Sequence, residues 1–159
     1  MKVYKYSEYN MSESVSDKIK IGLDFHGVID ALPKFFSFLT EAVIKNGGEI
    51  HIITGNSLTD EFIDSLKSMG IHWTHLFSIL DYHREMKTPT RENHPTYGFP
   101  MINDDDWDKT KGEYCKNNNI SFHIDDTTVY NEYFTTPFAR LWTHNNNPKK
   151  SHKDPRHLD

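Results

Sequence analysis

Three carboxylates stand where predicted strands end. Asp24 lies in an alternating apolar stretch at residues 19–25, and Asp125 and Asp126 directly follow another such stretch at 120–124. If both strands belong to one parallel sheet, their carboxyl ends meet at the same edge, and the three carboxylates share one crevice. Such charges repel by on the order of several kcal/mol at an intermediate dielectric, so a cation must offset them or some must stay protonated. An all-oxygen ligand set with room for water favours Mg²⁺.

Groups suited to holding an anion stand beside these strand ends. Gly27 and Gly55 allow backbone N–H groups to approach an anion closely. Thr54 offers a hydroxyl donor, and Lys111, expected at the start of the helix before the acidic pair, can reach over the strand ends. A carboxylate nucleophile, a divalent metal ion, a hydroxyl, backbone donors and a lysine together suit a phosphoryl group that is attacked by an aspartate.

The elements that must position these groups alternate between strand and helix along the chain. Alternating apolar residues predict strands, and apolar stripes with the helical period predict helices. Five strands separated by helices predict an α/β fold, a Rossmann-like three-layer α/β/α sandwich with a five-stranded, mainly parallel sheet. We expect this domain at residues 18–144, after an N-terminal extension (1–17) and before a polar tail (145–159). The expected strands are at 19–25, 49–54, within 71–79, at 120–124 and at 138–142, and the expected helices at 32–46, 59–69, about 111–118 and about 129–134.

Residues 80–106 interrupt this alternation. The segment holds three prolines and is too long for an ordinary connection, so we expect a small lid insertion over the crevice. Cations next to aromatic faces suit a phosphorylated ring compound, so the expected partner is a small phosphorylated substrate, first of all a nucleotide, or a polynucleotide end. The predicted substrate-binding residues are Gly27, Gly55, Asn56, Arg84 and Lys87. Further cations and aromatic residues of the lid, with Trp107 just beyond it, are Tyr82, His83, Arg91, His94, Tyr97 and Phe99.

Composition narrows the classes of function. The chain has 159 residues, a formal charge of −5 and one cysteine, so one domain is expected, and an internal disulfide and a Cys-based zinc cluster are excluded. No apolar run approaches the roughly 20 residues of a membrane helix, and residues 1–18 lack the apolar segment of a signal peptide. A cytoplasmic protein without a membrane partner is therefore expected. The negative charge argues against a general nucleic-acid coat.

Four parts of the chain, in order, resemble the motifs of the haloacid dehalogenase superfamily of phosphohydrolases, near its small deoxyribonucleotidase-like members. They are IGLDFHGVID, HIITGN, a lysine, and HIDDT, and the resemblance covers about residues 18–142. It implies that Asp24 is the nucleophile that forms an aspartyl-phosphate, that Thr54 binds phosphoryl oxygens, and that Lys111 neutralises the nucleophile and the phosphate. Lys109 is a rival for the lysine role, but Lys111 directly precedes the helix leading to the acidic pair.

The same resemblance implies a Mg²⁺ site. Asp24, Asp126 and the backbone carbonyl of His26 would hold the ion, and Asp125 would order its waters. Phosphatases of this superfamily usually carry an aspartate two residues after the nucleophile, which protonates the leaving group and later activates water. This chain has His26 there. Because histidine has an unperturbed pKa of about 6.5 and can do acid–base work, we expect His26 to replace that aspartate.

Ordinary structural roles compete with several of these interpretations. Asp24 would also suit a turn cap, and the acidic pair a solvated turn. His72 and His75, three apart on a predicted strand, would point to opposite faces and would not share a metal ion. Residues 104–108 lack the Gly and Glu of a calcium loop, so a solvated loop near the cleft is expected. The expected core residues outside the site include Phe35, Phe36, Phe62 and the buried thiol of Cys115.

Three functions are compatible with this pattern. The first is a Mg²⁺-dependent phosphohydrolase acting on a small phosphomonoester, with Asp24, His26, Thr54 and Lys111 as catalytic residues. The second keeps the fold as a catalytically weakened nucleotide-binding protein, in which His26 marks the loss of hydrolysis. The third is non-phosphate chemistry in the same cleft, because some relatives without that aspartate cleave carbon–halogen or carbon–phosphorus bonds.

Overall fold

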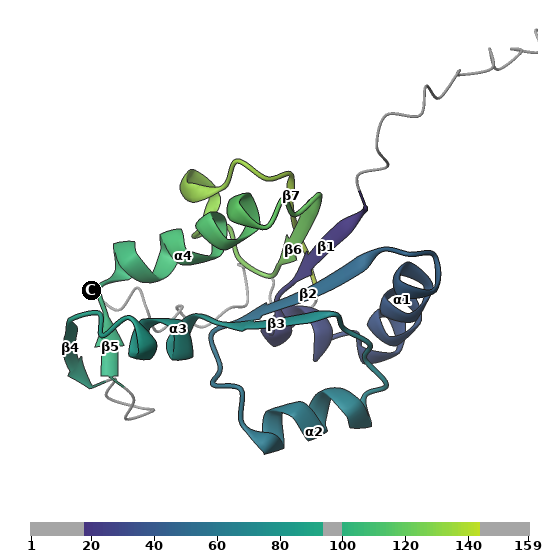
Figure 1. Cartoon of the computed structure of the whole chain (residues 1–159), viewed down its shortest axis with the longest axis horizontal. Helices are drawn as coiled ribbons and strands as arrows, with labels where there is room; N and C mark the ends of the chain where they lie inside the picture. The colour runs from purple at the N-terminus through teal and green to yellow at the C-terminus, as the bar shows by residue number, and fades with distance from the viewer. Residues whose placement is uncertain (1–17, 94–99, 144–159) are drawn as a thin grey trace, which may run out of the picture.

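A five-stranded sheet with every strand parallel to its neighbours runs through the centre of the computed structural model, which describes residues 18–93 and 100–143 (Figure 1). The strand order is β3-β2-β1-β6-β7. This confirms the predicted α/β fold of Rossmann-like type, with a sheet that is wholly parallel rather than mainly so. The predicted extension (1–17) and tail (145–159) lie outside the described residues. The strands are β1 (Lys20–Leu23), β2 (Glu49–Thr54), β3 (His75–Ser78), β6 (Phe122–Asp125) and β7 (Phe138–Arg140).

Helices cover both faces of this sheet (Figure 1). On one face, α1 (Pro33–Lys45) and α2 (Asp60–Ser68) bury Phe36, Phe62 and Leu66 against the apolar residues of β1 and β2. On the other face, α4 (Asp104–Asn117) packs Cys115 against Ile53 and Ile120. The three layers follow from this two-sided burial. Among the described residues, no helix combines the length and the apolar character that a bilayer crossing requires.

Local signals set the ends of α1 and α2 close to their predicted positions. Pro33 occupies the first turn of α1, where its missing N–H costs no hydrogen bond. The side chain of Thr59 caps α2 by accepting the backbone N–H of Phe62 at 3.2 Å. Gly70 stops the chain after α2 with a φ of +70°, a conformation that glycine adopts without strain.

The order of the strands reverses direction at β1. From there the chain adds β2 and β3 on one side through α1 and α2, and later adds β6 and β7 on the other side. The residues that follow β1 and β6 therefore lie side by side, and the N–H of Asp24 donates to the carbonyl of Ile124 at 3.0 Å. Open parallel sheets bind ligands at such a switch point, beyond the carboxyl ends of the strands.

The predicted lid contains more regular structure than its composition indicates. α3 (Ile79–Glu85) continues directly from β3, and β4 (Thr90–Asn93) pairs antiparallel with β5 (Pro100–Ile102). Ser78 starts the helix by accepting the N–H of Asp81 on its side chain. Three residues predicted to face the substrate, His94, Tyr97 and Phe99, lie outside the described residues, as does the side chain of Arg91.

The start of α4 corrects two predictions. The helix begins at Asp104 rather than near Lys111, so residues 104–106 form its first turn and not a solvated loop. The side chain of Asn103 caps this turn by accepting the N–H of Asp105, and acidic side chains there complement the positive end of the helix dipole. Lys111 therefore sits in the middle of the helix, on the side that faces the sheet.

Other elements are shorter than predicted. β1 ends at Leu23. Phe25 belongs to η1 (Phe25–Ile29), a distorted helical turn that forms the loop after this strand. The expected helix at 129–134 is a single 3-10 turn, η2 (Asn131–Tyr133). Phe35 is 54% exposed on α1, so its assignment to the core is wrong, whereas Phe36 and Phe62 are buried as predicted.

We expect Cys115 to be chemically silent in the folded protein. Its side chain is fully buried between α4, to which it belongs, and the sheet. Burial raises the pKa of its thiol to about 12, so near pH 8 the reactive thiolate is absent. A chromogenic disulfide reagent should titrate one thiol in denaturant and label the native protein at least roughly a hundredfold more slowly. Rapid labelling of the native chain would contradict the packing of α4 on the sheet.

Candidate active site

The three acidic residues singled out in the sequence converge at the switch point. Asp24 follows β1 directly, Asp125 ends β6, and Asp126 is the next residue. One carboxylate oxygen from each residue lies within 4.8 Å of one from each of the others. Asp24 and Asp125 are buried, while Asp126 is partly exposed. The adjacency of the parallel strands β1 and β6 produces this cluster.

A buried lysine joins the cluster from the opposite layer. The ammonium of Lys111 lies 3.0 Å from Asp24 Oδ1 and 2.7 Å from Asp125 Oδ2, and only 2% of the residue is exposed. The same ammonium stands 4.6 Å from the ring centre of Tyr130, where a cation–π contact adds to the ion pairs. Lys109, its rival in the sequence, is on the surface and pairs with Asp106 at 2.6 Å. The structure thus brings Lys111, and not Lys109, to the carboxylates.

Burial and charge leave these groups with different affinities for a proton. Burial raises the pKa of Asp24, Lys111 lowers it only in part, and Asp125 and Asp126 add repulsion, so that it stands at about 6. Burial would also raise the pKa of Asp125, but Lys111 and His123 outweigh it, and the net shift is downward. Burial lowers the pKa of Lys111, yet its two carboxylate partners hold it well above its ordinary value. Lys111 is therefore shared between two buried carboxylates that differ in their affinity for a proton.

The convergence of three carboxylates fits a hard divalent cation. The donors are carboxylate oxygens, which suit Mg²⁺, and the raised pKa of Asp24 shows that Lys111 alone does not compensate its charge. Gly27 shapes the loop beside them, because a Cβ at this position would lie 2.5 Å from Asp126 Oδ2 and the backbone has a φ of +72°. Asp24 and Asp126 are the residues that would hold the ion, with Asp125 beside them.

His26 lies at the rim of this cluster and is held from two sides. Its Nδ1 lies 3.1 Å from Asp30 Oδ2, and its Nε2 lies 3.0 Å from the side-chain nitrogen of Asn56. Asp30 also accepts the N–H of Gly27 at 2.6 Å. The Gly27 N–H is therefore engaged within the loop. Asp30 was not among the predicted site residues, although its position four residues after His26 is a spacing at which helical side chains meet.

The loop after β2 brings the second group of predicted residues near the switch point. The hydroxyl of Thr54, which is buried, accepts the N–H of Asn56 at 3.1 Å. Gly55 lies against the ring of Trp107, since a Cβ there would approach the ring to 2.9 Å. An aromatic ring from α4 thus borders this loop, and the absence of a side chain at Gly55 is what allows this contact.

Arg84 and Lys87, the cations predicted to bind substrate from the lid, lie apart from the carboxylate cluster. Arg84 donates to the hydroxyl of Ser57 at 2.7 Å and pairs with Asp81 at 3.1 Å, so it lies beside the loop after β2. With Lys87 it lines a pocket of about 210 Å³ on the lid. Among the contacts of the described residues, neither cation touches the carboxylate cluster. The other residues lining this pocket are Leu80, His83, Thr88, Thr90 and Ile102.

His123 is a further member of the cluster that the sequence interpretation missed. It is fully buried on β6, and its Nε2 lies 3.2 Å from Asp125 Oδ2. Its Nδ1 has no hydrogen-bond partner among the described residues. Nε2–H donates to Asp125 in this geometry, because a carboxylate oxygen can only accept. The alternation of β6 is the signal that could have found it, since residues 123 and 125 share a face.

Comparisons of the chain with protein-family models, with curated proteins and with solved structures find no match. Function is therefore inferred from the geometry and chemistry of the site.

We expect the charge of Asp24 to cost stability when no metal is bound. The folded protein raises the pKa of this carboxyl from 3.8 to about 6, so its ionisation destabilises the fold as the pH rises through that window. In EDTA near pH 8, Asp24→Asn should increase the free energy of unfolding by about 1–3 kcal/mol, and the gain should vanish below about pH 4.

Urea unfolding across this pH range measures the effect. Asp106→Asn is the matched control, because Asp106 is a surface carboxylate whose pKa is lowered by its bond to Lys109, and its removal should give no gain. A wild-type protein as stable as Asp24→Asn near pH 8 would contradict the electrostatics described for the cluster.

Proposed function

We propose that this protein is a Mg²⁺-dependent phosphohydrolase of the haloacid dehalogenase type, which passes a phosphoryl group from a small phosphomonoester to Asp24 and then to water. One observation carries the proposal. The carboxylate of Asp24 stands at the sheet's switch point with Lys111 3.0 Å away and with Asp125 and Asp126 within ligand distance of a common ion. A nucleophile, a fixed cation and an oxygen-rich metal site meet there.

The reaction would proceed in two displacements. An oxygen of Asp24 attacks phosphorus while the bond to the leaving-group oxygen breaks, which leaves an aspartyl-phosphate. A water molecule then attacks that phosphorus, phosphate departs, and Asp24 is regenerated. Lys111 compensates the charge of the nucleophile and of the incoming phosphoryl group, with the hydroxyl of Thr54 as a donor at the neighbouring strand end. Bound Mg²⁺ would supply further neutralisation of the phosphoryl oxygens.

His26 would serve as the acid and base of both steps. In its protonated form Nδ1–H would donate to Asp30, and Nε2–H would exchange its contact with Asn56 for the leaving oxygen. After giving up that proton, Nε2 accepts one from the attacking water. Asp30 thus fixes the ring orientation and the tautomer, as a carboxylate partner does for other catalytic histidines.

A nucleotide is the substrate that the surroundings of the site favour. The ring of Trp107 borders the loop after β2, and the pocket with Arg84 and Lys87 lies beside the same loop. A flat apolar surface and cations near a phosphoryl site suit a base and its phosphate, and the end of a polynucleotide carries the same groups.

The second candidate function keeps the binding site but not the turnover. His26 replaces the usual aspartate, and both of its ring nitrogens already have partners in Asp30 and Asn56. If these contacts hold the ring away from the leaving group, the protein binds nucleotides with weakened hydrolysis, or performs non-phosphate chemistry in the same cleft.

The first test is phosphate release from nucleotides, sugar phosphates and an aryl phosphate with Mg²⁺. We expect a preference for nucleotides and loss of activity in EDTA. Asp24→Asn and Lys111→Met should lower kcat by about 10³-fold or more, because each removes a group on which the chemistry depends. Lys109→Met is the control and should keep full activity. Turnover unchanged in Asp24→Asn would refute the mechanism, and a preference for sugar phosphates would refute the substrate class.

A second set of variants tests His26. His26→Ala should lower kcat by roughly 10²-fold to 10⁴-fold, the range typical for loss of a general acid–base group, and Asp30→Asn should lower it less. The measurement is the steady-state rate on the best substrate of the panel. Undiminished turnover in His26→Ala would remove the residue from this role. A strong rise in His26→Asp would favour the weakened enzyme instead.

A further inference from the structure

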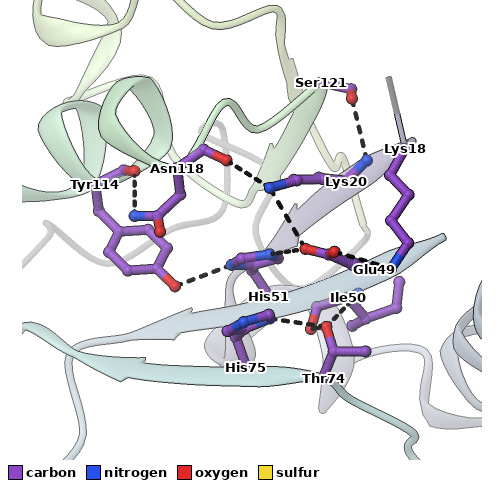
Figure 2. A network of polar contacts seen from close by, with 10 residues as sticks. All are labelled: Lys18, Lys20, Glu49, Ile50, His51, Thr74, His75, Tyr114, Asn118 and Ser121. Carbon is purple, nitrogen blue, oxygen red and sulfur yellow. Dashed lines mark hydrogen bonds and ion pairs between the residues drawn. The ribbon is translucent and has the colours of Figure 1, made fainter. Parts of the chain in front are cut away.

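A second cluster of ligand-type side chains, formed by Glu49, His51 and His75, lies on β2 and β3 (Figure 2). Glu49 opens β2, His51 follows two residues later, and both side chains lie on the face covered by α4. β3 pairs with β2 in a register that sets His75 directly beside His51. Glu49 precedes Thr54 by five residues, or roughly 16 Å along the strand, so this cluster is separate from the carboxylates around Asp24.

We propose that Glu49, His51 and His75 form a binding site for a transition-metal ion of the Zn²⁺ class. One ligand atom from each residue lies within 4.8 Å of one from each of the others. Two imidazoles and one carboxylate suit Zn²⁺ better than Mg²⁺, which prefers oxygen alone. Three protein ligands leave a fourth position for water or another ligand.

The burial and the hydrogen bonds of His51 suit it to bind a metal ion. It is almost fully buried, and burial lowers its pKa, which favours the neutral imidazole that metals bind. Its Nε2 faces Glu49 Oε2 at 3.2 Å, and its Nδ1 faces the hydroxyl of Tyr114 at 2.9 Å. Metal-binding histidines usually have such a hydrogen-bond partner on the second nitrogen.

The Tyr114 hydroxyl can form a hydrogen bond with His51 both in the metal-free and in the metal-bound protein. Burial raises its pKa to about 12, so it keeps its proton. In the free protein it donates to Nδ1, while Nε2–H of His51 donates to Glu49. When a metal occupies Nε2, the ring proton resides on Nδ1 and is donated to the Tyr114 oxygen. His51 thus changes tautomer without losing a proton, and its Nδ1 keeps Tyr114 as a hydrogen-bond partner.

The other two ligands can adjust. His75 is exposed and stacks on His51 with ring centres 4.1 Å apart and an angle of 11° between the planes. Since metals bind in the plane of an imidazole, the His75 ring must turn, which solvent exposure permits. Glu49 is paired with Lys18 and Lys20, and a metal would displace Lys20 from Oε2. Lys20 keeps a second partner, the carbonyl of Asn118 at 3.2 Å.

The test measures Zn²⁺ binding to the full chain by equilibrium dialysis with excess Mg²⁺ present, so that the oxygen site is filled. His75→Ala removes an exposed ligand, and Tyr114→Phe removes only the hydroxyl that supports His51. Each should weaken the strongest site at least about tenfold. His72→Ala is the matched control, because His72 is also exposed, precedes β3 and lies outside the cluster; it should leave the affinity unchanged.

Co²⁺ provides an independent measurement, since the intensity of its visible absorption reports the number and geometry of its ligands and should change in His75→Ala but not in His72→Ala. Thermal unfolding in EDTA verifies that the variants fold. The proposal is overturned if the wild-type chain binds no Zn²⁺, or if His75→Ala and Tyr114→Phe bind it as tightly as His72→Ala does.

Discussion

The buried ammonium of Lys111 between Asp24 and Asp125 is the interaction on which the rest of this molecule depends. A buried lysine is costly unless it is paired, and a buried carboxylate without its partner is costly as well. Each of the three groups comes from a different element, namely α4, the end of β1 and the end of β6. The pairing therefore joins the helical layer to the sheet at its switch point. It is also the feature on which the proposed metal site and the proposed phosphoryl chemistry depend.

Those parts of the fold that depend on local pattern could be predicted from the sequence. The bounds of β2 are those predicted, and α1 and α2 agree to within a residue at each end, because alternation, a helical stripe and capping residues are all local. The convergence of Asp24 with the acidic pair was also predictable, since parallel strands end at a common edge. α4 was misjudged because its first turns are polar, and their stability comes from the cap and the helix dipole rather than from an apolar stripe.

Contacts between distant residues were out of reach of the sequence. The pairing of His51 with His75 depends on the register of β2 against β3, which no local pattern encodes. Asp30 reaches His26 because the chain turns at Gly27 with a positive φ. Phe35 is exposed because the sheet covers a narrower strip of α1 than the apolar residues of that helix span. In each case the missing information was tertiary: which strand neighbours which, and how much of a helix the sheet covers.

Three residues of the single helix α4 contact three separate parts of the molecule. Trp107, Lys111 and Tyr114 are spaced by four and three residues, so they form one line along the helix and reach the Gly55 loop, the carboxylates and His51 in turn. Inserting or deleting one residue within this line would swing its later members by about 100° and break their alignment.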